Sequence, residues 1–296
     1  MNQFFMDSLR MMQENYVRAF GTAYNPSMCP IKTVEVDERD ASGVVTASTG
    51  FLRGMTIDGV SSLKRIYTND INGKTEEILD IRKKNGSEHE YRDLALTRYR
   101  CSLMTVFTLE RLMRSSPKSI GFIGTGRTNL ANCIGICERF SPSQIIIRGS
   151  KRNIDKNIGD FLLVHGNTEV DETENFALLN TCDAVVICTS ATKRQELIDA
   201  SVLSHPDVII ALDSGYYLDE SFRKKRDNYS DCPAQLDAHF ADEFPWDEKH
   251  YSFKNLLEPR NVNPCAAYLY GIGLADAVAG EEITERIEES FDKAHL

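Results

Sequence analysis

The spacing of apolar side chains divides the chain into two parts with different patterns. Before about residue 115, short stretches alternate apolar and polar positions, which is typical of strands with one buried face. The predicted strands are 33–37, 43–47, 63–67 and 77–81. Apolar residues three or four positions apart predict amphipathic helices at about 4–20 and 93–114. The first third is therefore predicted to mix strands with two flanking helices.

From Lys118 onward the apolar positions form short continuous runs. These predicted strands are 119–123, 144–147, 184–188 and 208–212, with a helix predicted at 129–140. Strands that are apolar throughout indicate a parallel sheet covered by helices on both faces. We predict an α/β protein with a Rossmann-type doubly wound parallel sheet over 116–262. The tail, 266–294, is predicted to be a helix that packs back on the first part, so residues 1–115 and 263–296 form a second, discontinuous α+β domain.

Composition narrows the class of protein. A chain of 296 residues favours two domains. With 26% charged and 42% hydrophobic residues, it is neither collagen-like nor largely disordered. The net charge of −10 makes it a poor candidate for binding nucleic acid or an anionic membrane surface. No apolar run approaches the length of about 18 residues that a membrane span needs. An enzyme or a small-molecule binder is the expectation.

Cysteine and histidine usage gives expectations about location and metals. The eight cysteines include no CxxC pair, and the charged N-terminal helix does not resemble a secretory signal. Reduced thiols in a cytoplasmic protein are therefore expected. The six histidines are dispersed, without an HExxH or HxH pattern, so we expect no metal centre.

A glycine-rich turn follows the first apolar strand of the second part. Gly124, Thr125, Gly126 and Arg127 connect strand 119–123 to the next helix. Such a turn lets the backbone approach a pyrophosphate at the positive end of a helix. Asn129 stands where the GxGxxG fingerprint has its third glycine, which the fingerprint does not predict. A dinucleotide site is expected here, and a tight turn without a ligand is the alternative.

The end of the next strand bears on which dinucleotide binds. NAD sites usually have an acidic residue there, which hydrogen-bonds the ribose hydroxyls. This chain has instead Arg148, Ser150, Lys151 and Arg152, which offer charge-assisted partners to a 2′-phosphate. NADP(H) is therefore favoured and NAD(H) stays possible. A solvated basic loop is the other interpretation.

Four stretches, in this order along the chain, resemble motifs of the ornithine cyclodeaminase/mu-crystallin family. The stretches are Leu96–Ser102, Ile120–Gly126, Asp183–Ala191 and Gly271–Val278. The resemblance covers most of the chain and implies a dinucleotide-binding domain with a substrate-binding and dimerisation domain. It also implies that Thr189 and Ser190 contribute to the cofactor site. A homodimer formed through residues before about 115 is implied as well.

The resemblance carries over roles for individual residues. Arg100 matches an arginine that clamps the α-carboxylate of the substrate, and Lys64 matches a lysine that lies over the substrate and can protonate it. Asp213 matches an aspartate that acts as general acid or base. A second carboxylate-binding arginine upstream of Lys64 could be Arg39 or Arg53.

These features predict NAD(P)-dependent hydride transfer at the α-carbon of an amino acid or cyclic imino acid. In an imine or ketimine reductase, or an amino-acid dehydrogenase, Lys64 or Asp213 would supply the proton. One alternative is a cyclodeaminase, an ammonia-lyase with tightly bound NAD and no net redox change. Another is a non-catalytic, crystallin-like protein that binds NADP.

Overall fold

In the computed structural model the chain forms two compact units, each assembled from separate stretches of sequence. One contains Met1–Met6 and Cys101–Gly271, and the other contains Asp7–Arg100 and Ile272–Leu296. We call them the parallel-sheet unit and the antiparallel-sheet unit. The structure describes residues 3–43, 45–69, 71, 74–92, 94–149, 169–173, 175–189, 198–212, 215, 218–243, 253–260 and 263–294. The assignment of cofactor and substrate binding to separate domains stays a prediction.

The antiparallel-sheet unit is built on five strands in the order β1-β2-β3-β4-β5, and each strand is antiparallel to its neighbours. The strands are β1 (Thr33–Arg39), β2 (Val45–Met55), β3 (Ser61–Asn69), β4 (Lys74–Arg82) and β5 (Glu88–Tyr91). β1, β3 and β4 contain the strands that the alternating pattern predicts and are longer. β2 overlaps its predicted strand, 43–47, only at 45–47 and continues to Met55. The sequence did not predict β5, because Glu-His-Glu-Tyr has no apolar alternation.

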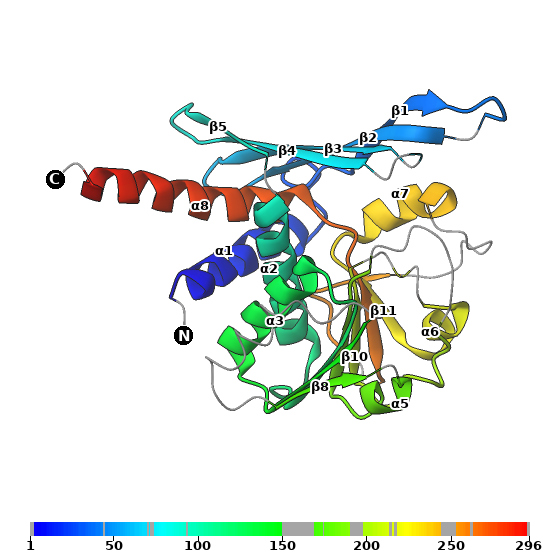
Figure 1. The fold of residues 1–296 in the computed structure, drawn as a ribbon. Coiled ribbons are helices and arrows are strands. Elements are labelled where there is room, and N and C mark those ends of the chain that lie inside the picture. The colour runs from blue at the N-terminus through cyan, green and yellow to red at the C-terminus, as the bar shows by residue number, and fades with distance from the viewer. Residues whose placement is uncertain are drawn as a thin grey trace. The chain divides into compact units, whose positions relative to one another are not determined.

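The C-terminal helix α8 (Gly273–Ala294) packs on β2, β3 and β4 of this sheet (Figure 1). Its first turn lies very close to β2, because a Cβ atom added to Gly54 would stand 2.0 Å from the backbone carbon of Gly273. The Ser62 hydroxyl donates a hydrogen bond of 2.8 Å to the Gly273 carbonyl. Packing of the tail helix on the first part of the chain is thus as predicted.

The parallel-sheet unit contains eight strands in the order β12-β11-β13-β10-β9-β6-β7-β8, all paired in parallel. The strands are β6 (Ser119–Ile123), β7 (Gln144–Arg148), β8 (Glu169–Thr173), β9 (Ala184–Ile187), β10 (Val208–Ala211), β11 (Asp227–Ser230), β12 (Lys254–Asn255) and β13 (Cys265–Tyr268). The strand order reverses between β6 and β9, which is the switch point of a doubly wound sheet. The predicted Rossmann-type fold class is confirmed.

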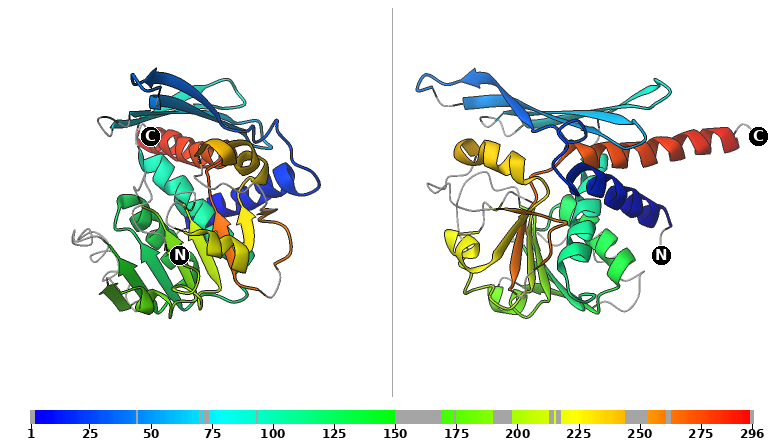
Figure 2. Two further views of the ribbon diagram at one scale, coloured as in Figure 1. Left: turned by 90° about the vertical axis from the view of Figure 1, so that its right-hand side faces the viewer. Right: turned by 180° about the vertical axis from the view of Figure 1, so that it is seen from behind.

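Helices cover both faces of this sheet. Figures 1 and 2 show α3 (Arg127–Phe140) and α6 (Glu220–Lys225) on opposite sides of it. The other helices in the described part of the chain are α1 (Gln3–Phe20), α2 (Leu94–Leu112), α5 (Phe176–Leu179) and α7 (Pro233–Glu243). Apolar side chains of β9 and β10 are completely buried in the core of the unit. Among the described residues, no helix is both long and apolar enough to cross a membrane.

The prediction of one continuous helix over 266–294 is wrong at its start. Cys265–Tyr268 form β13, which pairs with β10 on one side and β11 on the other. A short apolar run of Cys-Ala-Ala-Tyr suits a buried strand as well as a helix, so periodicity alone does not distinguish them. The helix begins only at Gly273.

Candidate functional site

The glycine-rich turn lies at the carboxyl end of β6, beside the switch point. Gly124 has a φ of +103°, and a Cβ atom there would stand 2.1 Å from the carbonyl oxygen of Cys188. Its backbone N–H donates to the Arg148 carbonyl at 2.8 Å. A side chain at position 124 is therefore excluded by both conformation and space. The turn joins the ends of β6, β7 and β9.

The residues of this turn fit a pyrophosphate. Gly126 is the N-cap of α3 and has no side chain that could accept a hydrogen bond from the first N–H groups of the helix. A Cβ atom added to Gly126 would meet nothing within 4 Å. Backbone N–H groups at such a helix start can receive an anion. Arg127, the first residue of α3, is exposed, and the half-buried Thr125 lies against Gly149.

Asn129, the departure from the fingerprint, stabilises the turn. Its side-chain amide donates to the carbonyls of Ile123 and Gly124, each at 2.9 Å. Its own oxygen accepts from Asn132 at 3.1 Å, and the Thr105 hydroxyl of α2 donates to the Asn132 oxygen at 3.1 Å. These three polar side chains are buried, and the bonds among them and to Ile123 are shielded from water, whereas the bond to Gly124 is partly buried. At the position of the fingerprint's third glycine, this chain therefore has an asparagine whose hydrogen bonds hold the turn in place.

The end of β7 presents Arg148 above an aromatic ring. The central guanidinium carbon of Arg148 lies 3.8 Å from the ring centroid of Phe176, at the start of α5. Thr189, predicted to contact the cofactor, follows β9 and is half-buried. Ser150, Lys151 and Ser190 lie outside the described residues.

A second group of predicted residues gathers in the antiparallel-sheet unit. Lys64 of β3 is 1% exposed, and its Nζ donates to the Thr97 hydroxyl of α2 at 2.5 Å. The same Nζ lies 2.9 Å from Oε2 of Glu77, on β4. The Thr97 hydroxyl in turn donates to Glu77 Oε2 at 2.5 Å. Lysine, threonine and glutamate therefore form a closed triangle of hydrogen bonds.

Arg100 joins this group through Asp276. Oδ1 of Asp276, on the first turn of α8, lies 3.3 Å from Nε of Arg100 and 3.9 Å from Nζ of Lys64. Asp276 is completely buried, and neither of its carboxylate oxygens accepts a hydrogen bond from a described residue. We call Lys64, Glu77, Thr97, Arg100 and Asp276 the charged cluster.

The charges of the cluster balance, with two cations and two carboxylates. Burial would raise the pKa of Glu77, but the charge of Lys64, the hydrogen bonds from Thr97 and Lys64, and the charge of Arg100 together lower it. Glu77 is therefore ionised near neutral pH. The buried ion pair of Lys64 and Glu77 holds both side chains in fixed positions, at a considerable cost in desolvation free energy.

Neither candidate for the second arginine joins the cluster. The alternation of β2 and its register with β3 place Arg53 on the sheet face opposite Lys64, where its side chain is exposed beside Phe51. Arg39, also exposed, donates to the Gly43 carbonyl at 2.8 Å. Asp213 lies outside the described residues. Lys64 and Arg100 are thus the predicted substrate residues that the structure brings together.

Sequence reasoning missed Glu77 as a partner of Lys64 and Asp276 as a partner of both cations. A signal for Glu77 exists in hindsight, because it is a charged residue at an inward-facing position of a predicted strand. Asp276 stands in one of the four family-like stretches, but its contacts come from residues far apart in the sequence.

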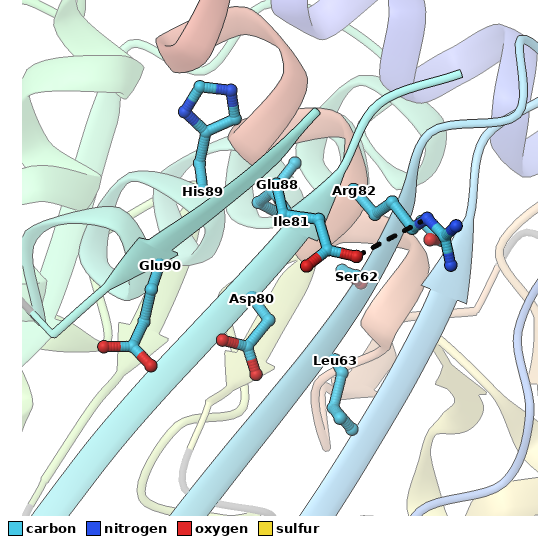
Figure 3. A pocket seen from close by; sticks show the side chains of 9 residues that line it. Ser62, Leu63, Asp80, Ile81, Arg82, Glu88, His89 and Glu90 are labelled. Atoms are coloured by element: carbon cyan, nitrogen blue, oxygen red, sulfur yellow. Dashed lines mark ion pairs between the residues drawn. The ribbon is translucent and has the colours of Figure 1, made fainter. Parts of the chain in front are cut away.

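A separate hollow of about 490 Å³ lies on β3, β4 and β5, and charged, polar and apolar residues line it (Figure 3). Its charged side chains form ion pairs: Arg82 lies 3.6 Å from Glu88 (Figure 3). Asp80 lies 2.8 Å from Arg65, which is outside the lining. Arg82 and Glu88 are largely exposed, and Arg65 and Asp80 are half-buried, so all four groups already have partners in contact with solvent and we assign the hollow no ligand. Among the described residues, no three His, Cys, Asp or Glu side chains are grouped to hold a metal ion.

Comparison with known proteins identifies the fold. No protein-family model matches the chain, and no curated protein matches its sequence. The solved Δ1-pyrroline-2-carboxylate reductase of Thermococcus litoralis, in complex with NADH and L-proline, is 12% identical with a TM-score of 0.76, covering 97% of this chain and 94% of its own. Iminosuccinate reductase of Paracoccus denitrificans, in complex with NAD⁺, is 15% identical with a TM-score of 0.75, covering 98% and 93%.

A lysine cyclodeaminase is also similar. Its structure addresses recognition of L-lysine, L-ornithine and L-2,4-diaminobutyric acid, and it is 14% identical with a TM-score of 0.73, covering 97% of this chain and 87% of its own. At these identities the likeness establishes the fold. The chain therefore has the fold of this group of reductases and cyclodeaminases, as the four family-like stretches predicted.

Proposed function

We propose that the protein catalyses NAD(P)H-dependent reduction of the C=N bond of an imino acid, with hydride transfer to the α-carbon. A single observation carries the proposal. Lys64 and Arg100, selected from separate stretches of sequence, lie within 3.9 and 3.3 Å of the same Asp276 oxygen. Reductases and a cyclodeaminase share this fold, and the structures of the two reductases contain NADH or NAD⁺. This similarity supports the same proposed function.

The cofactor is assigned to the parallel-sheet unit. Gly124, Thr125, Gly126 and Arg127 would hold the pyrophosphate, because the space beside Gly126 is open and α3 begins at the next residue. A bound nicotinamide supplies the hydride. The choice of NADP(H) over NAD(H) is part of the proposal and rests on Arg148, with Ser150 and Lys151 after it.

The substrate is assigned to the charged cluster. The planar guanidinium of Arg100 suits a bidentate bond to the α-carboxylate. Lys64 has three N–H donors, of which Thr97 and Glu77 take two, so the third is available to the imine nitrogen. Asp213 is the proposed second acid/base group.

The balance of charge points to the class of substrate. Two cations and two carboxylates leave the cluster without net charge, so a ligand of zero net charge enters at the lowest electrostatic cost. A carboxylate combined with an ammonium nitrogen, as in the amino acid that the reduction forms, meets that condition. A second carboxylate on the ligand would add an unbalanced buried charge. This supports monocarboxylic imino acids over dicarboxylic ones.

The test is NADPH oxidation followed at 340 nm with a panel of cyclic imino acids and with ketimines formed from α-keto acids and ammonia or methylamine. We expect turnover with monocarboxylic substrates and a much lower rate with NADH. Lys64→Met, which removes the ammonium but retains a similar length, is expected to lower kcat more than 100-fold.

Two other results would replace this proposal. Release of ammonia from a diamino acid with NAD⁺ alone, without net change in absorbance at 340 nm, would identify a cyclodeaminase. Tight NADPH binding without turnover of any member of the panel would identify a binding protein instead.

A further inference from the structure

Of the four ionic groups of the charged cluster, Glu77 is the most accessible to solvent. Its side chain is 14% exposed, compared with 10% for Arg100, 1% for Lys64 and 0% for Asp276. Lys64 is therefore enclosed, and its hydrogen-bond partners among the described residues are Glu77 and Thr97. A proton that leaves Lys64 toward a substrate has to be replaced through these neighbours.

The geometry around Lys64 provides two connected routes. Nζ of Lys64 lies 2.9 Å from Oε2 of Glu77, so a proton can pass between them directly. The Thr97 hydroxyl accepts from Lys64 and donates to the same Glu77 oxygen, each at 2.5 Å. A hydroxyl that accepts on one side and donates on the other can pass a proton along by exchanging its own. Both routes end at Glu77.

From this arrangement we propose that Glu77 is the positioning residue through which Lys64 exchanges its proton with solvent. The inference rests on the proposed reduction, in which Lys64 donates to the imine nitrogen. Glu77 acts through Lys64 and does not touch the substrate.

The step balances over one turnover. The Lys64 ammonium gives one proton to the imine nitrogen and becomes a neutral amine, while the carbon receives the hydride already assigned to the nicotinamide. The C=N bond becomes a C–N bond with new N–H and C–H bonds. Glu77 takes one proton from water and passes it to the amine of Lys64, directly or through Thr97. One solvent proton is consumed for each bond reduced.

Asp276 does not connect Lys64 to solvent in the same way. It faces Lys64 at 3.9 Å, beyond hydrogen-bond distance, and it is completely buried. Arg100, the other charged group of the cluster, stays protonated and cannot relay a proton. The register of the sheet explains why Glu77 can: β3 and β4 pair Lys64 with Leu79, so Glu77 is the diagonal neighbour of Lys64 on the same face.

The test compares Glu77→Gln with Glu77→Asp and with a matched control, Glu76→Gln. Glu76 is the preceding residue of β4 and is exposed. For Glu77→Gln we expect kcat to fall about 10- to 100-fold, within the range for proton-transfer groups, with KM changed by less than about threefold. We expect partial recovery in Glu77→Asp and in Glu77→Ala with added acetate. The alkaline limb of the kcat profile should move to lower pH in Glu77→Gln, because the ammonium of Lys64 loses its counter-charge.

Thr97→Val separates the two routes. It removes the hydroxyl and leaves the direct contact between Lys64 and Glu77, so a reduction of about threefold to tenfold in kcat is expected, smaller than that of Glu77→Gln. A pH profile of Glu77→Gln that matches wild type, or a loss of activity that neither aspartate nor acetate relieves, would overturn the inference.

A measurement without turnover distinguishes this inference from the proposed function. In protein labelled with ¹⁵N-lysine, the Nζ resonance of Lys64 is assigned by its loss in Lys64→Arg, and its titration is compared between wild type and Glu77→Gln. We expect the ammonium signal to disappear at lower pH in Glu77→Gln, and an unchanged titration contradicts the role of Glu77. If the titration shifts but wild type reduces no imine, the proposed function fails and the proton link between Glu77 and Lys64 stands.

Discussion

The guanidinium of Arg148 stacks on the ring of Phe176, with its central carbon 3.8 Å from the ring centroid. A cation held against an aromatic face has lost much of its rotational freedom before a ligand arrives. A 2′-phosphate would therefore meet a donor at the end of β7 that is already oriented.

The first prediction concerns this arginine. NADPH is expected to bind more tightly than NADH, and Arg148→Ala should weaken NADPH binding about 10- to 100-fold, the equivalent of about 1.5–3 kcal/mol for one charge-assisted contact. NADH binding should change little. Phe176→Leu keeps the Arg148 cation but removes the aromatic ring beneath it, so NADPH binding is expected to weaken by a smaller factor. Fluorescence titration of both cofactors measures this, and equal midpoints for NADPH and NADH in wild type would contradict it.

The second prediction concerns the ladder beneath the glycine-rich turn. Asn129→Asp keeps the shape of the side chain but replaces its amide N–H donor with a carboxylate oxygen. The two hydrogen bonds to the carbonyls of Ile123 and Gly124 then become repulsive contacts between oxygens. A loss of about 1–3 kcal/mol is expected, visible as a lower Tm and about tenfold weaker NADPH binding. Thr128→Ser, a conservative change of the half-buried neighbouring residue, is the control. Unchanged cofactor binding in Asn129→Asp would show that the ladder serves stability alone.

The third prediction separates Arg100 from Asp213. The proposed partner of Arg100, a carboxylate, is the same in the ground and transition states, so Arg100→Gln should raise KM with a smaller fall in kcat. Asp213→Asn removes an acid/base group and should lower kcat about 10²- to 10⁴-fold with cofactor binding nearly intact. The reverse pattern would assign substrate binding to Asp213.

Because Arg100 also lies beside Asp276, its loss leaves a buried carboxylate with less counter-charge. The double variant Arg100→Gln with Asp276→Asn restores the balance and serves as the control for stability. If KM recovers in the double variant, Arg100 acts on the fold of the cluster and does not bind the carboxylate.

The fourth prediction concerns assembly. Every residue of the edge strand β1 is exposed, including Val34 and Val36 at 41% and 46%, and an edge strand of this kind is an available pairing surface. We predict a homodimer formed through residues before about 115, seen by light scattering at micromolar concentration. Replacing Val34 and Val36 with lysine should shift it to monomer. Ile71→Lys, at a position that is 75% exposed, should leave it a dimer.

The fifth prediction is a pH dependence of stability from Glu281 on α8. Burial, together with the charges of Glu285 and Asp58, raises the pKa of Glu281 to about 7. The folded state therefore binds its proton more tightly than the unfolded state does. The stabilisation is complete below about pH 4, near the ordinary pKa of a glutamate, and is lost as pH rises through 7.

Glu281→Gln fixes the neutral form. Its Tm at pH 8 should exceed that of wild type by about 2–4 °C, the shift that corresponds to about 1 kcal/mol, with little difference at pH 5. Glu38→Gln, an exposed residue of β1, is the control. A Tm difference that is the same at both pH values would contradict the assigned ionisation.

The sequence predicted best where the structure is determined locally. The strand Ser119–Ile123 was predicted with its observed bounds because an apolar run ends in glycines there. The strands β11 and β12 were missed, because Asp227–Ser230 and Lys254–Asn255 are polar and form strands only through their parallel neighbours. Tertiary pairing overrides weak intrinsic preference at these positions.

In the charged cluster, too, some residues could be predicted from local sequence and others depend on tertiary structure. Lys64 and Arg100 were found through motifs, which record residue types along the chain. Glu77 became visible only with the β3–β4 register, and Asp276 only once α8 lay on the sheet. Arg53 was proposed from its position upstream of Lys64, but an odd-numbered residue of β2 faces away from the side that carries Lys64. One residue of register decides which face a side chain occupies.

The attachment of α8 to the first sheet also affects how the protein folds. Ser62 and Gly273 hydrogen-bond across 211 residues of sequence, whereas β2, β3 and β4 pair through short hairpins. Hairpins close quickly, but a contact between such distant residues needs a large loop to close first. The folding of Cys101–Gly271 between them replaces that open loop with a compact unit. Variants that slow folding of the parallel sheet should therefore delay the arrival of Asp276 beside Lys64, so substrate-binding capacity should appear later in refolding than the hairpins themselves.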